Sequence, residues 1–186
     1  MTWASSVIID PNKTDTYGVA SGFITPAAAT TDMFTLSGEA GFKIELLKAL
    51  LNYDAVTGSS TARTKAYLLK RSALNTGGTS TAENHIPFNS ASPASGAIMR
   101  SYTANPSALG ALVNTSGRVC TGAFMLNALP AQSTTSAFVL FDHSLAGDAP
   151  KLVSATELLA VNFNGVIPDG TTPLVQCAFI YRRSPL

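Results

Sequence analysis

The amino-acid sequence predicts an all-β fold: an antiparallel β-sandwich resembling a jelly roll, with about eight strands and an extended N-terminal arm. Strand-length apolar segments, separated by turn residues, recur from about residue 32 to the C-terminus, and no segment has a convincing helical pattern. Hydrophobic residues make up 46% of the 186 residues, which is enough to form one core. Only 12% are charged, and serine, threonine, alanine and glycine replace the missing charges. We expect a single sandwich without internal repeats.

Residues 1–31 are expected to form the arm, and residues 32–186 the sandwich domain. The first segment has no sustained periodicity, and it contains Pro11, Pro26 and a run of alanines and threonines. Several of its side chains are large and apolar, which is unusual in a freely solvated leader. We therefore expect the arm to pack against a partner through Trp3, Val7, Ile8 and Ile9.

After the arm, strands are expected at residues 33–36, 42–53, 64–71, 98–103, 118–126, 137–141, 151–154, 157–164 and 175–182. In the second of these, Phe42, Ile44 and Leu46 alternate with polar residues, which places them on one face of a sheet. The leucines that follow, as far as Leu51, would also suit one face of a helix. The alternation before them favours the strand.

A long loop is expected over residues 72–97, which contain a Gly-Gly pair and two prolines. Gly77 and Gly78, after Asn75, supply a backbone that can adopt positive φ in a tight turn. His85 is expected on the surface of this loop. These residues either shape a loop of the sandwich or form subunit contacts, so Asn75, Gly77, Gly78 and His85 are candidate interface residues.

No catalytic or metal-binding arrangement can be assigned. Asp142, His143 and Ser144 are the residue types of a hydrolytic triad, but neighbouring strand residues point to opposite faces, so we expect them to end a strand and enter a turn. Glu83 and His85 lack the further ligands that a metal site needs. No phosphate-binding glycine motif is present. We expect no enzyme activity, no cofactor and no metal.

Charge and hydropathy argue against a nucleic-acid-binding or membrane-spanning protein. The net charge of +1 provides no basic surface for nucleic acid, and no apolar run approaches the ~20 residues that span a bilayer. The first residues lack the basic region of a signal peptide. Cys120 and Cys177 lie far apart, within apolar strand-like runs, and are expected to be free buried thiols.

Residues 30–38 read TTDMFTLSG, residues 68–81 contain LLKRS and then NTGGTST, and residues 159–166 read LAVNFNGV. These three segments resemble a recurrent group of virion proteins from tailed bacteriophages and prophages. The first segment is similar to the opening TDxFTxxGSA of that group. The second resembles its KRSxxNTGGTST signature, and the third resembles its LAVNxNG strand and turn. Order and spacing agree over about residues 23–183. The resemblance implies a β-sandwich structural component of the phage particle, without catalytic residues.

The expected function is that of a non-enzymatic structural virion protein, most specifically a capsid decoration or cement protein that binds the head surface through its arm and loops. A tail, baseplate or fibre component is the alternative, and a carbohydrate-binding module for the host surface is a third. Expected partners are the major capsid protein or other virion proteins and further copies of the chain, with a trimer favoured. Nucleic acid and membrane are not expected partners. The expected location is the virion, assembled in the cytoplasm of the host bacterium. The low charge predicts that charge-poor faces are interfaces.

Overall fold

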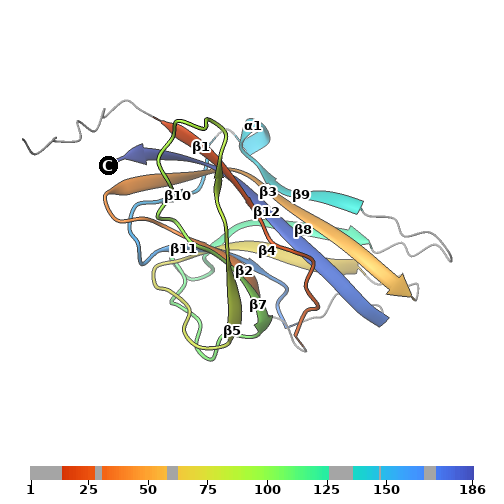
Figure 1. The fold of residues 1–186 in the computed structure, drawn as a ribbon. Helices are drawn as coiled ribbons and strands as arrows, with labels where there is room; N and C mark the ends of the chain where they lie inside the picture. Colours follow the sequence, from red (N-terminus) through yellow and green to blue (C-terminus); the bar gives the residue numbers. More distant parts are fainter. Residues whose placement is uncertain (1–13, 28–30, 58–62, 126–135, 147, 166–170) are drawn as a thin grey trace, which may run out of the picture.

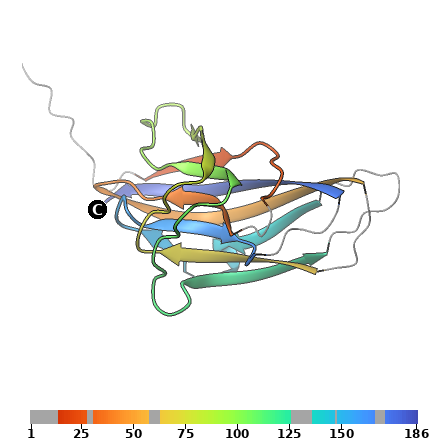
Figure 2. The same ribbon diagram turned by 90° about the horizontal axis from the view of Figure 1, so that it is seen from below.

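The computed structural model describes residues 14–27, 31–57, 63–125, 136–146, 148–165 and 171–186. In these residues, twelve strands form two six-stranded antiparallel sheets that are stacked face to face, and there is one short helix (Figures 1 and 2). The prediction of an all-β antiparallel sandwich is confirmed. The predicted number of about eight strands is too low, because several short strands extend the edges of the sheets.

The first sheet has the order β10–β3–β12–β1–β6, and β9 also pairs with β3. Both β9 and β10 fit beside β3 because they pair with successive parts of this long strand. The strands are β1 (Asp15–Ala20), β3 (Phe42–Thr57), β6 (Ile86–Pro87), β9 (Ser136–Asp142), β10 (Lys151–Leu152) and β12 (Thr171–Pro185).

The second sheet has the order β5–β7–β2–β11–β4–β8. Its strands are β2 (Asp32–Ser37), β4 (Arg63–Arg71), β5 (Thr79–Glu83), β7 (Met99–Ala104), β8 (Arg118–Met125) and β11 (Leu158–Asn162). The helix α1 (His143–Ala146) is one turn long and follows β9 directly (Figure 1). Among the described residues, no helix is long and apolar enough to cross a membrane.

The connectivity is that of a jelly roll. Strands pair in a nested way, β1 with β12, β2 with β11, β3 with β9 and β4 with β8. The first and third pairs lie in the first sheet, and the second and fourth in the second sheet. Eight strands therefore form a jelly roll. The other four, β5, β6, β7 and β10, are additions to its sheets.

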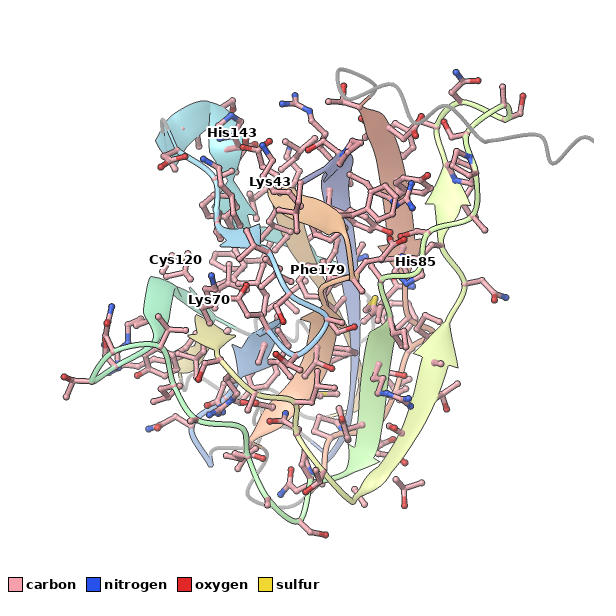
Figure 3. The ribbon with its side chains drawn as sticks, turned by 90° about the vertical axis from the view of Figure 1, so that its left-hand side faces the viewer. Lys43, Lys70, His85, Cys120, His143 and Phe179 are labelled. Carbon is pink, nitrogen blue, oxygen red and sulfur yellow. The ribbon has the colours of Figure 1, made fainter. Side chains whose placement is uncertain are left out.

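The core fills the space between the sheets. Tyr17 and Tyr181 are fully buried, and their rings stack with centroids 5.4 Å apart. Phe34 in β2 and Phe163 directly after β11 are also fully buried in this core, and Phe179 lies at its centre (Figure 3). Each such side chain contributes about 1.5–3 kcal/mol through its removal from water.

β3 is a strand throughout, which settles the helix alternative for its leucines. Ile44, Leu46, Ala49 and Leu51 are buried, so the alternation slips by one residue between Leu46 and Ala49. The pairing of β3 with β12 shifts at the same place, where Ile180 is opposite Lys48 and Tyr181 opposite Leu46. This β-bulge puts an extra residue into β3 and gives its leucines a spacing that imitates a helix.

Two predicted boundaries are wrong. Asp15–Ala20, assigned to the arm, forms β1 inside the first sheet between β12 and β6, so the sandwich begins before residue 32. Residues 72–97, predicted as one loop, contain β5 and β6. The predicted arm residues 1–13 and the predicted turn at residues 168–170 lie outside the described residues.

Candidate binding site on the outer face of the second sheet

A buried ion pair crosses the outer face of the second sheet. Asp32 begins β2 and Arg71 ends β4, and these residues are 0% and 4% exposed. Arg71 Nε donates to Asp32 Oδ2 over 2.6 Å, and Arg71 Nη2 donates to Oδ1 over 3.0 Å. This two-pronged geometry is the strongest form of an arginine–carboxylate contact.

Two amides complete the network around the carboxylate. Asn162 Nδ2, from β11, donates to Asp32 Oδ1 over 2.7 Å, and Asn75 Nδ2 donates to Oδ2 over 2.8 Å. Asn75 Oδ1 accepts from the Gly110 N–H, and the Gly110 carbonyl accepts from Arg71 Nη1. The buried charges thus have hydrogen-bond partners on several sides, which a buried ion pair requires to be tolerated.

The network joins the three segments that carry the resemblance. Asp32 belongs to the first segment, Arg71 and Asn75 to the second and Asn162 to the third. Far apart in sequence, these segments act as one structural unit in the fold. Sequence reasoning identified Asn75 but did not single out Asp32 or Arg71. The available signal was a charged residue next to apolar strand residues in a chain with few charges.

Gly77 and Gly78 form a tight turn after the network. Both have positive φ, 68° and 78°, as the sequence predicted. A Cβ on Gly78 would lie 2.6 Å from the Asn105 carbonyl oxygen, and one on Gly77 would lie 2.4 Å from Ser107 Oγ. The neighbouring residues of the β7–β8 connection therefore require glycine at both positions.

Beside this turn lies a cavity of about 360 Å³, which we call the outer cavity. The loop after β4 forms one wall through Leu74, Asn75, Gly77 and Gly78. Thr35 and Arg100, which are opposite each other on β2 and β7, share the outer face of the sheet, whereas their neighbours Phe34 and Met99 belong to the core. Three of the predicted interface residues, Asn75, Gly77 and Gly78, thus line one cavity.

His85 has a different place from the one predicted. It is half-buried, and it connects the segment between β5 and β6 to the first sheet (Figure 3). Met99 N–H donates to Nε2 over 3.1 Å, and Nδ1 lies 2.7 Å from the Tyr181 hydroxyl, which donates to Ser95 Oγ. Burial lowers the pKa of His85, while the charge of Glu39 acts in the opposite direction. The prediction of a surface histidine is wrong, and its ring does not line the outer cavity.

Asp142, His143 and Ser144 do not form a triad. Asp142 Oδ1 accepts from both the backbone N–H and the hydroxyl of Ser144, over 2.9 and 2.6 Å, and so caps α1. These bonds, together with Lys48 at 2.9 Å, lower the pKa of Asp142 to about 2. His143 Nδ1 has no hydrogen-bond partner among the described residues. The residues end a strand, as predicted.

The cysteines are free, as predicted. Cys177 is buried in the core, and Cys120 is partly buried and packs against the core cluster. Burial raises the pKa of both thiols. Across the described parts of the chain, no three or more histidine, cysteine, aspartate or glutamate residues gather as a metal site would need. Trp3, Val7, Ile8 and Ile9 lie outside the described residues.

The outer face of the first sheet carries a continuous apolar row. Ala20, Ala178, Leu50 and Val139 are opposite one another on β1, β12, β3 and β9. They alternate with core residues, so they point away from the sandwich interior, and Val139 is 46% exposed. In the neighbouring row, Gly18 and Ile180 continue the uncharged surface as far as the Lys48–Asp142 pair, and Ile86 and Phe88 at its edge are 68% and 65% exposed.

Comparisons with protein-family models, curated proteins and solved structures find no match to this chain.

Proposed function

We propose that this protein is a structural component of a tailed-phage virion and that it decorates the capsid surface. The observation that carries this proposal is the convergence of the three resembling segments on the network of Asp32, Arg71, Asn75 and Asn162. A resemblance in three separate strings would be weak if they were unrelated in space. Here it concerns the residues that hold together one side of the sandwich, so it amounts to similarity in one structural feature.

The fold is compatible with this role. Jelly rolls occur in viral capsid proteins as well as in lectins and cupins, so the fold alone does not select the function. The distribution of charge adds the selective argument. The apolar row of Ala20, Leu50, Val139 and Ala178 extends across four strands, and contiguous apolar surface of this kind marks protein contacts.

The proposed occupant of the apolar row is a neighbouring virion protein, the major capsid protein or another copy of this chain. An uncharged sheet face fits a protein surface better than it fits a charged polymer. The trimeric state and the contacts of Trp3, Val7, Ile8 and Ile9 belong to the same proposal. Deletion of residues 1–13 tests those contacts and, unlike deletion of residues 1–31, leaves β1 in place.

The copy number in separated particle parts tests the function. We expect quantitative mass spectrometry of purified heads and tails to find the chain in heads, in a number that matches symmetry-related positions of the capsid. Recovery only in tails would instead support a tail, baseplate or fibre role. Absence from both parts would contradict any structural role in the virion.

The attachment surface is tested with two matched valines. Val139→Lys places a charge in the apolar row, whereas Val153→Lys changes a valine of similar exposure, 48%, that is not part of the row. Because a buried unpaired charge is costly, we expect Val139→Lys to weaken binding to particles assembled without the protein by at least about tenfold. Val153→Lys should bind like the parent protein, and equal binding of all three proteins would contradict the assigned surface.

A further inference from the structure

The outer cavity contains a cation that lacks a carboxylate partner in the described structure. Arg100 lines the cavity, and the only hydrogen bond of its side chain to a described residue is a long one, 3.3 Å from Nη1 to Ser80 Oγ. No carboxylate of the described residues lies within ion-pair distance of it. Arg71, by contrast, is neutralised by Asp32. An arginine with free donors in a cavity is suited to bind a planar carboxylate from outside.

Hydroxyl groups form much of the remaining polar lining. Thr35 and Tyr102 are 3% and 5% exposed, and both line the buried part of the cavity. Ser37 Oγ accepts from the Ile98 N–H over 3.1 Å, which leaves its own O–H free to donate. Ser80 contributes a further hydroxyl. Hydroxyls both donate and accept, as the hydroxyls of a sugar do.

Apolar side chains and a fixed wall complete the cavity. Leu74 and Ile98 line it and are 45% and 42% exposed, so they can contact the C–H face of a small ring. Both ends of the Asn75 amide are engaged, by Asp32 and by Gly110, which holds the wall that Asn75 forms. The volume of about 360 Å³ lies within the usual range for small-molecule sites, roughly 300–1,000 Å³.

We propose that the outer cavity binds an acidic monosaccharide unit, with its carboxylate on Arg100 and its hydroxyls on Ser37, Ser80 and the hydroxyls of Thr35 and Tyr102. An acidic peptide side chain would use the guanidinium, but its carboxylate has no donors for the surrounding hydroxyls. This site goes beyond the proposed structural function. It is independent of the apolar row, which lies on the other sheet.

The test is an NMR titration of the full chain with N-acetylneuraminate and glucuronate, with glucose, glutarate and a glutamate-containing peptide as the other ligands. We expect both acidic sugars to shift the amide signals of Gly77, Gly78 and Arg100 saturably, and glucose and glutarate to bind at least about tenfold more weakly. Arg100→Gln should weaken binding at least about tenfold. Arg118→Gln should bind like the parent, because Arg118 stacks on Tyr67 near the opposite edge of the sheet. Thermal unfolding establishes that both variants are folded.

Each other outcome overturns the assignment. Binding of glutarate or of the peptide as tightly as the acidic sugars, at the same amides, would mean a carboxylate site for a protein partner. Equal loss with Arg118→Gln would mean that Arg100 is not the recognition residue. No saturable shift at Gly77, Gly78 and Arg100 with either acidic sugar would mean that the cavity does not bind this class. None of these results bears on where the protein sits in a virion, so the two proposals fail separately.

Discussion

Asp32 and Arg71 show how a chain with few charges uses two of them inside the protein. Removing both ions from water is costly, and their attraction offsets this cost only when the geometry is good and the remaining hydrogen-bonding positions are satisfied. The two-pronged contact and the amides of Asn75 and Asn162 meet these conditions. The pair therefore fixes the relative positions of β2, β4 and β11 more than it adds net stability.

Removing one partner of this pair should be strongly destabilising. Arg71→Gln leaves the Asp32 carboxylate buried without its cation, and we expect a loss of about 3–5 kcal/mol in the free energy of unfolding. Arg182→Gln is the matched control, because Arg182 is 42% exposed and contacts Glu45 over 3.4 Å. The control should cost less than about 1 kcal/mol. Urea unfolding measures both changes, and similar losses would contradict the structural role of the network.

His85 makes stability depend on pH. The Met99 N–H donates to Nε2, so this nitrogen is unprotonated and Nδ1–H donates to Tyr181. Protonation of Nε2 would set two donors against each other. Because burial lowers the pKa of His85 in the folded state, the unfolded state binds the proton first as the pH falls.

The contribution of neutral His85 to stability is therefore complete above about pH 6.5, the ordinary pKa of histidine. It is lost as the pH falls through the lower pKa that His85 has in the folded state. We expect the melting temperature to drop below this pH with a slope of up to about one proton taken up on unfolding. His85→Gln should flatten this part of the profile, while His143→Gln should keep it. A parent profile that is flat between pH 7 and 5 would refute the tautomer assignment.

At the scale of elements, the alternation of apolar and polar residues and the turn residues between segments were sufficient to locate the strands that are long and have one buried face. They located β2, β3, β4, β7, β8, β9, β11 and β12, and the predicted strand at residues 151–154 also contains the short β10. They failed for β1, where Tyr17 and Val19 keep the alternation but are the only large apolar residues on the buried face, and Gly18 lies between them on the outer face. A Cβ on this glycine would lie 3.0 Å from the ring of Phe88, a close approach between residues that are 70 positions apart in the sequence. Local pattern carries no information on such a contact.

The missed strands β5 and β6 have a different explanation. β5 is a polar strand at the edge of the second sheet. β6 lies at the edge of the first sheet and consists of two residues, one of which is Pro87. Proline has no N–H to donate to a β-ladder, so an edge strand is the place where it is tolerated. Only part of the lining of the outer cavity could be predicted from the sequence. Asn75, Gly77 and Gly78 stand out as turn chemistry, whereas Arg100 and Tyr102 become site residues only when β7 pairs with β2.

The turn after β4 gives a prediction at this scale. Gly78→Ala forces a side chain into positive φ, next to the Asn105 and Ala104 carbonyls at 2.6 and 2.8 Å. We expect a loss of at least about 1–3 kcal/mol in unfolding free energy. Gly22→Ala, an exposed position with no atom within 4 Å of the added Cβ, should stay within about 0.5 kcal/mol. Thermal melts of both variants compare them, and a neutral Gly78→Ala would contradict the turn geometry.

For the whole molecule, two features of the fold lower the number of charges that face solvent. Part of the charge is internal, in Asp32 and Arg71, and another buried arginine, Arg183, is held by Glu39 at 2.7 Å. The outer face of the first sheet carries the uncharged apolar row. Together they leave fewer charges for solvent, which fits a protein that works within an assembly.

A cryo-electron microscopy reconstruction of the source phage particle tests the structural role most directly. Our account predicts density for the jelly roll at symmetry-related positions on the head surface, with the apolar row of the first sheet facing a neighbouring subunit and the outer cavity of the second sheet left open. A reconstruction that lacks the sandwich on the head, or that shows the apolar row exposed to solvent, would contradict it.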